Sequence, residues 1–139
     1  MKNYLIINFE AIGMSLFITL VIMTIILIFI SSIINKENYN KITHLYEERF
    51  GNLPQTARMA RGASLIGSPG IYLAKVDLIM SSLILPYNRV FNRDMSFEEY
   101  SFIRTLPSEL TTGFKVEAIL WIIESIVLVC FILLNVLFY

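Results

Sequence analysis

Two long apolar runs dominate the pattern of hydrophobic and polar positions along the chain. The first, residues 11–34, lies in a stretch without a charged residue between Glu10 and Lys36. As a helix it rises about 36 Å at roughly 1.5 Å per residue, enough to cross a hydrocarbon core of about 30 Å. The second run, 118–139, is interrupted by one acidic residue, Glu124. We expect both runs to be transmembrane helices.

A signal peptide is the alternative interpretation of the first run, because Lys2 provides a basic start. The run is longer than the roughly 7–15 apolar residues of a signal core. In addition, Glu10 precedes it and no clean small-x-small cleavage pattern follows it. We therefore interpret 11–34 as a retained membrane span.

Basic residues indicate how the chain is oriented in the membrane. Ten of the eleven Lys and Arg lie between the two runs, and the remaining one is Lys2. Loops rich in Lys and Arg stay in the cytoplasm. We therefore expect a multi-pass protein of the bacterial inner membrane, with residues 35–117 cytoplasmic and 1–10 a short non-cytoplasmic N-terminus.

The middle segment, 35–117, has the length and pattern of a small helical insert. Residues 39–50 carry apolar side chains at helical spacing, and Gly51 follows where a helix often ends in glycine. Residues 71–85 show a broader apolar stripe. A third span is the alternative for 71–85, but fifteen residues that include two charges are too short to cross comfortably. We expect this helix to lie on the membrane surface or to pack on the other cytoplasmic helices.

A third helix of the insert is marked by its first residues. Ser96-Phe97-Glu98-Glu99 matches the S-x-x-E capping box, in which Ser96 and Glu99 satisfy each other's backbone amides. We expect this helix to end near Leu106, with Pro107 starting or kinking the helix that follows. The sequence thus predicts an all-α membrane protein, with an antiparallel pair of spans and a cytoplasmic helical insert.

The composition supports a membrane location and excludes several kinds of binding site. Hydrophobic residues make up 56 % of the chain and charged residues 16 %, and the formal net charge is zero. Soluble domains average roughly 45–50 % hydrophobic residues and about 25 % charged residues. A neutral chain has no basic footprint for nucleic acid. The single cysteine, Cys130, and the single histidine, His44, provide neither a disulfide nor a metal cluster.

No motif in the sequence predicts catalysis. Gly62 to Ser68 has the glycine spacing of a phosphate loop, but Ser68 stands where such a loop needs lysine. Glu98, Glu99 and Glu109 are explained by helix capping and solvation, and no nucleophile with its base can be assembled. We expect a protein that is not an enzyme and has no catalytic residue, metal or cofactor.

Glu124 is the most informative residue, because an ionisable group inside a span is costly and usually faces protein or water. Glu124 and Asn135 share one face of the second run, and in an antiparallel pair they fall at the depths of polar or small residues of the first run. We expect polar packing inside the pair by Glu124, Asn135, Thr24, Ser31 and Gly13. Snorkelling of a Glu124 without function is the alternative.

Two further sets of residues are candidates for contacts outside the pair. Ala11, Ser15 and Thr19 form a small-residue row on a separate face of the first run, which would accept another helix. Arg58 and Arg61 lie near small residues and could hold anionic lipid headgroups, with an ordinary positive-inside charge pair as the alternative.

The layout of the chain, together with Asp94 to Lys115 (DMSFEEYSFIRTLPSELTTGFK), resembles the bacterial universal stress protein B family. An acidic start, Phe-Ile-Arg and a polar helix lead into the last span in this stretch. The chain departs from the family by its greater length, fewer basic residues before the second span, and Pro107. The resemblance implies an inner-membrane protein with a stress-linked role, and it supplies no catalytic residue.

These observations favour a non-enzymatic accessory or interaction subunit. Its expected partners are membrane lipids and another membrane protein or further copies of the chain, and no nucleic acid. Two alternatives remain open. One is a membrane-resident immunity protein against a toxin, which small size and few soluble features would fit. The other is an oligomeric channel or proton path centred on Glu124.

Overall fold

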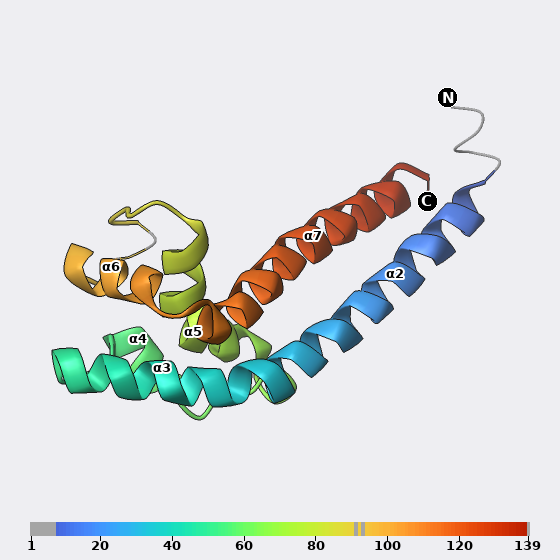
Figure 1. Cartoon of the computed structure of the whole chain (residues 1–139). Helices are drawn as coiled ribbons and strands as arrows, with labels where there is room; N and C mark the ends of the chain where they lie inside the picture. The colour runs from blue at the N-terminus through green and yellow to red at the C-terminus, as the bar shows by residue number, and fades with distance from the viewer. Residues whose placement is uncertain (1–7, 91, 93, 139) are drawn as a thin grey trace. The chain divides into compact units, whose positions relative to one another are not determined.

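All the regular secondary structure of the described residues is helical. The computed structural model describes residues 8–90, 92 and 94–138, and these residues contain no β-strand. The all-α prediction is therefore confirmed for the described part. Lys2, Tyr139 and residues 1–7 of the expected N-terminal segment lie outside it. The elements are α2 (Phe9–Phe29), the π-helix η1 (Ile30–Ile34), α3 (Asn35–Phe50), α4 (Gln55–Met59), α5 (Pro69–Ile84), α6 (Phe97–Thr105) and α7 (Ser108–Phe138) (Figure 1).

Backbone contacts divide the chain into two compact units. The two-helix unit comprises, among the described residues, 8–27 and 119–138, and the helical domain is Ile28–Ala118. The boundary at Ile28 falls inside the expected first span, because Ile30 and Ser31 are buried with the helical domain.

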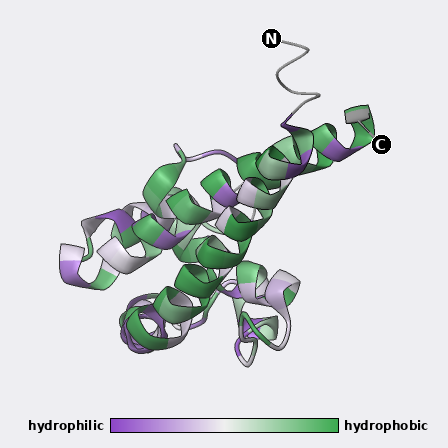
Figure 2. Cartoon of the chain, turned by 90° about the vertical axis from the view of Figure 1, so that its right-hand side faces the viewer, coloured by the Kyte–Doolittle hydropathy of each residue, from purple (hydrophilic) through white to green (hydrophobic). Residues whose placement is uncertain are grey.

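The two-helix unit contains the apolar parts of α2 and α7. Two helical stretches, Phe9–Phe50 and Ser108–Leu137, are long and apolar enough to cross a membrane. Only 22 % and 0 % of their most apolar windows are buried, whereas the core helix of a soluble protein would be mostly buried. Both helices are mostly green in the hydropathy colouring (Figure 2). These properties support a membrane location.

The helical domain has a core of its own. Its largest fully buried side chains come from α3, α5, α6 and α7: Tyr46, Phe114, Ile42, Ile79 and Ile103. The rings of Tyr46, Phe50 and Phe102 lie 4.9–6.2 Å apart, an aromatic cluster between α3 and α6. Helix α5 contacts both α4 and α6. The expected helix 71–85 is therefore present, and it packs on other helices of the domain.

Two helix ends are formed as their sequences predict. Gly51 follows α3 with a φ of +86°, and its N–H donates to the Glu47 carbonyl at 2.9 Å. At the start of α6 the Glu99 amide donates to Ser96 Oγ at 3.3 Å, and the Ser96 amide donates to Glu99 Oε2 at 2.5 Å. The capping box prediction is confirmed.

At both predicted spans the helix extends beyond the apolar run that predicted it. The expected span 11–34 and the expected helix 39–50 form one helical stretch, because the polar residues between them are compatible with helix. Likewise, the described residues of the second run, 118–138, continue a helix that begins at Ser108, directly after Pro107. Polarity therefore changes along both stretches without ending the helix, and in the first stretch the π-helix η1 lies at the change.

Replacing Gly51 by alanine should destabilise the helical domain by about 1–2 kcal/mol, since an L side chain at positive φ is strained. Unfolding of the purified protein in detergent, followed by circular dichroism, measures this change. Gly70→Ala is the matched control, because Gly70 has no positive φ and nothing lies within 4 Å of an added Cβ. An equal loss in both variants would contradict the explanation.

Candidate functional site

Glu124 has a partner within the two-helix unit. Thr24 Oγ1 donates a hydrogen bond to Glu124 Oε1 at 2.6 Å, and it also lies 2.9 Å from the Leu20 carbonyl of its own helix. The side chain that sequence reasoning singled out in the second run thus meets a hydroxyl of the first run. A carboxyl oxygen in an apolar setting is satisfied by this contact.

The other residues expected near Glu124 are satisfied elsewhere. Asn135 Nδ2 donates to the Phe131 carbonyl one turn earlier, at 2.7 Å. Ser31 is buried in the helical domain, where its Oγ donates to the Ile28 carbonyl at 3.1 Å. A Cβ added to Gly13 would lie 3.9 Å from Leu134 Cδ2, so this glycine does face a side chain of α7. Of the expected polar set, the structure joins Glu124 to Thr24.

The structure also places the two sets of residues that we expect to contact a partner helix or lipid headgroups. Ala11, Ser15 and Thr19 are exposed on α2, and Thr19 Oγ1 donates to the Ser15 carbonyl. Arg61 pairs with Glu47 at 2.9 Å, whereas Arg58 is exposed at the end of α4. Arg61 thus has an acid partner, and the assignment of the two arginines to lipid headgroups stays a prediction.

A buried acid in the helical domain was missed by sequence reasoning. Glu117 on α7 has a fully buried side chain. Asn35 Nδ2 donates to its Oε2 at 2.5 Å, and the Tyr72 hydroxyl lies 2.9 Å from Oε1 and 3.2 Å from Oε2. The three side chains come from α7, α3 and α5, so this network ties three helices of the domain together.

The backbone near Glu117 also requires close packing. A Cβ added to Gly113, one turn before Glu117, would overlap Asn35 Oδ1 and lie 3.1 Å from Ile34 Cγ2. The glycine therefore lets α7 approach the start of α3 closely enough for Asn35 to reach the carboxylate. Burial raises the pKa of the Tyr72 hydroxyl, and the neighbouring Glu117 charge and hydrogen bond raise it further. Tyr72 therefore stays protonated and can donate to the acid.

Sequence position contained a weak signal for this network. Asn35 directly follows the first apolar run, and Glu117 directly precedes the second. Any hairpin of the two spans brings these two positions to the same end. Tyr72 carried no such signal, because its place on an apolar stripe is typical of a core aromatic.

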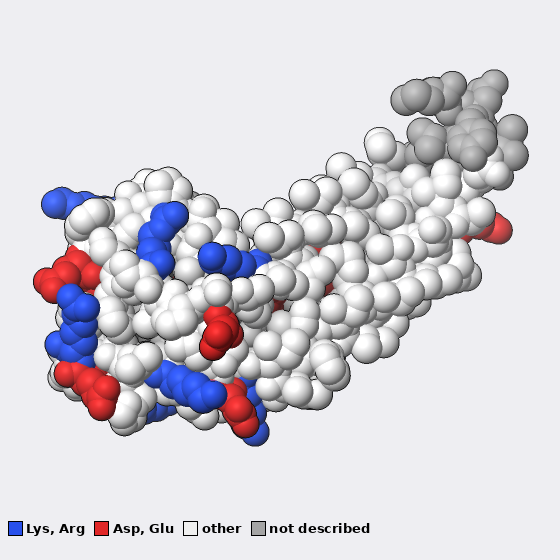
Figure 3. All heavy atoms as spheres, in the orientation of Figure 1, with Lys and Arg blue, Asp and Glu red and all other residues white. Residues whose placement is uncertain are grey.

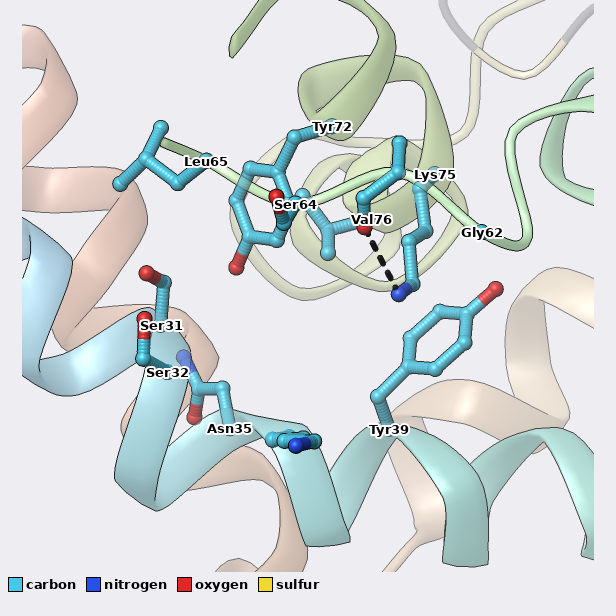
Figure 4. Close-up of a pocket in the computed structure, with 12 residues that line it drawn as sticks. Ser31, Ser32, Asn35, Tyr39, Gly62, Ser64, Leu65, Tyr72, Lys75 and Val76 are labelled. Atoms are coloured by element: carbon cyan, nitrogen blue, oxygen red, sulfur yellow. Dashed lines mark hydrogen bonds between the residues drawn. The ribbon is translucent and has the colours of Figure 1, made fainter. Parts of the chain in front are cut away.

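A pocket of about 270 Å³ opens beside this network in the helical domain (Figure 4). Its lining residues come from η1, α3, the loop after α4 and α5: Ser31, Ser32, Asn35, Lys36, Tyr39, Gly62, Ala63, Ser64, Leu65, Tyr72, Lys75 and Val76. Lys75 Nζ donates to the Ala63 carbonyl at 3.1 Å and lies 4.6 Å from the centre of the Tyr39 ring. Burial lowers the pKa of Lys75, and the charge of Lys36 lowers it further.

The part of the chain that the structure describes contains no candidate metal site. No group of three or more His, Cys, Asp or Glu side chains there is arranged to hold an ion. His44 is exposed and lies 3.5 Å from Glu48, four residues along α3. The candidate functional groups among the described residues are therefore the pocket and the two hydrogen-bonded acids Glu117 and Glu124.

Comparisons with protein-family models, with curated proteins and with solved structures found no match to this chain. The resemblance to the universal stress protein B family therefore stays a prediction from the sequence.

Replacing Glu117 by alanine should lower the stability of the helical domain by about 3 kcal/mol, because Asn35 and Tyr72 would lose their buried acceptor. Glu117→Gln keeps one acceptor oxygen and should cost less. Thermal unfolding in detergent measures both. Glu109→Ala, an exposed position on the same helix, should stay within about 0.5 kcal/mol of the native protein. Similar losses at Glu109 and Glu117 would contradict the role of the network.

Proposed function

We propose that the chain is an integral membrane protein whose two spans pair antiparallel, and that it acts as a non-enzymatic accessory or interaction subunit in the bacterial inner membrane. Three contacts in the two-helix unit support the pairing. Thr24 meets Glu124, the rings of Phe17 and Phe131 lie 6.4 Å apart, and Gly13 faces Leu134. Earlier residues of α2 thus meet later residues of α7, which is the register of an antiparallel pair.

The hydrogen bond between Thr24 and Glu124 is the observation that carries this proposal. A carboxyl group at membrane depth costs several kcal/mol unless protein groups satisfy it. Here the partner is a hydroxyl of the same chain, so Glu124 serves to join the two helices. A proton or ion path would need a series of relay groups, and the contact to Thr24 favours a structural use of the acid over conduction.

Charge distribution supports a cytoplasmic position for the helical domain. Five basic residues lie near the ends of the two apolar runs on the side of this domain: Lys36, Lys41, Arg49, Arg104 and Lys115. In the space-filling view the blue side chains and most of the red ones gather over the helical domain (Figure 3). Cytoplasmic loops carry such an excess of Lys and Arg. The domain would then present its polar surface to the cell interior.

An interaction role rests on the small-residue row of α2. Ala11, Ser15 and Thr19 are exposed at four-residue spacing, and small side chains let a second helix approach closely in lipid. The partner would be another membrane protein or a second copy of this chain. The stress-linked role implied by the family resemblance is compatible with an accessory subunit of this kind.

The pairing can be tested by cross-linking in a Cys130→Ser background, since Cys130 is an exposed free cysteine. A short thiol-bridging reagent should join Phe17→Cys to Phe131→Cys within one chain, so that the two halves stay linked after cleavage in the segment 35–117. Ile25→Cys with Phe131→Cys is the control, because Ile25 lies about 12 Å further along α2. Equal linkage in both pairs would contradict the register.

The interaction role can be tested by native mass spectrometry of the protein purified in mild detergent. We expect a stoichiometric complex, either a homo-oligomer or a partner complex. Ser15→Leu should weaken it at least about tenfold, because the larger side chain separates the helices. Ser125→Leu is the matched control in the other span, where Ser125 is also exposed. A monomeric native protein would overturn the proposal, as would equal effects of the two substitutions.

A further inference from the structure

The pocket of the helical domain is positively charged and rich in hydroxyl groups. Two lysines, Lys36 and Lys75, line it together with the serines Ser31, Ser32 and Ser64. None of the twelve lining residues is an acid. Ammonium and hydroxyl groups are hydrogen-bond donors, so this lining suits a ligand that accepts several hydrogen bonds and is negatively charged.

The two lysines line one pocket. Lys75 is partly buried. Its ammonium group has three N–H donors, and the structure shows one of them donating to the Ala63 carbonyl. Lys36 is exposed at the rim and its charge acts on Lys75. Two ammonium groups that face one pocket repel each other, and an anion placed between them attracts both and offsets this repulsion.

Tyr39 gives a second and independent indication of a ligand. Its side chain is only 4 % exposed, yet its hydroxyl oxygen has no hydrogen-bond partner among the described residues. Figure 4 shows the Tyr39 ring beneath the Lys75 ammonium, with the hydroxyl on the Gly62 side of the pocket. Buried polar groups are nearly always satisfied, so this hydroxyl calls for an acceptor that the protein itself does not provide.

The acids that act on the pocket residues Tyr39 and Tyr72 are engaged in other contacts. Glu117 lies behind Tyr72 and accepts hydrogen bonds from Tyr72 and Asn35. Glu47 is paired with Arg61 at 2.9 Å, and both act electrostatically on Tyr39. The positive charge of Lys36 and Lys75 is therefore not neutralised by an acid that lines the pocket.

We infer that this pocket binds a phosphate group, held between Lys36 and Lys75 with hydrogen bonds from the hydroxyls of Tyr39, Ser32 and Ser64. The volume of about 270 Å³ corresponds to roughly nine water molecules, which leaves room for a phosphate and the atoms attached to it. In the proposed membrane orientation, on which this step rests, Ser31 and Ser32 would lie at the cytoplasmic end of the span 11–34, near the level of lipid headgroups. An anionic phospholipid and a free phosphate compound offer the same chemistry.

Ligand-dependent stabilisation of the full chain tests this inference. The unfolding midpoint is measured in a maltoside detergent, which contains no phosphate, while inorganic phosphate, phosphatidylglycerol or phosphatidylcholine is added. Anything that binds only the folded protein raises the midpoint as its concentration grows. We expect a rise with at least one of the two anionic ligands. Phosphatidylcholine should act more weakly, because its choline cation meets the two lysines.

Substitutions at the rim and inside the pocket test the location. Lys36→Met should weaken the apparent Kd of the active ligand at least about tenfold. Lys41→Met, an exposed lysine of the same helix that does not line the pocket, is the matched control and should leave the Kd unchanged. Lys75→Met should also weaken binding, and Lys75→Arg, which retains the charge, replaces it if Lys75→Met does not fold. Tyr39→Phe removes only the unpartnered hydroxyl and should weaken binding as well.

The outcomes distinguish the sources of the phosphate group. Stabilisation by inorganic phosphate assigns the site to a soluble compound, and stabilisation by phosphatidylglycerol alone assigns it to a lipid headgroup. The inference is wrong if neither ligand stabilises the protein, or if Lys36→Met and Lys41→Met behave alike. The pocket lies within one helical domain, so these measurements remain informative if the antiparallel pair or the accessory role is wrong.

Discussion

A carboxylate that is removed from water must find donors in the protein, and this requirement governs both units of the chain. In the two-helix unit Thr24 provides the donor for Glu124. In the helical domain Asn35 and Tyr72 provide donors for Glu117, which is fully buried. Removing one partner of such a contact leaves the other group buried and unsatisfied, which is far more costly than losing a surface ion pair. Helix positions in the domain therefore depend on Glu117 more than on any exposed charge.

Local signals predicted most of the helices and several of their ends. The apolar runs predicted two helices long enough to span a membrane, and the positions of Gly51 and of Ser96 with Glu99 predicted caps that the structure contains. Such signals depend on residues within one helical turn, so a single sequence is enough to recognise them. The pattern predicted less well where a helix ends. The residues after position 34 change from apolar to polar, but the helix continues through them.

Contacts between distant segments could be predicted only where chemistry forces them. Glu124 had to find a partner, and the expected set included Thr24, which is the one it contacts. Asn135 and Ser31 belonged to the same set, but each donates to a carbonyl of its own helix, an option that the sequence does not exclude. Glu117 was missed because it precedes the apolar run, where an acid is normally solvated. Its burial follows from α3 and α5, which no local pattern of α7 encodes.

Helix α5 connects the buried acid with the proposed phosphate site. Tyr72 and Lys75 are three residues apart, so they lie on neighbouring positions of one helix face. Tyr72 donates to Glu117, whereas Lys75 reaches across the pocket to the Ala63 carbonyl and the Tyr39 ring. A phosphate group held by Lys75 and Lys36 would join α5 to the start of α3, the same two helices that Glu117 joins through Tyr72 and Asn35. Binding at the surface of the domain would therefore reinforce the packing that the buried carboxylate already imposes, because both act on the same pair of helices.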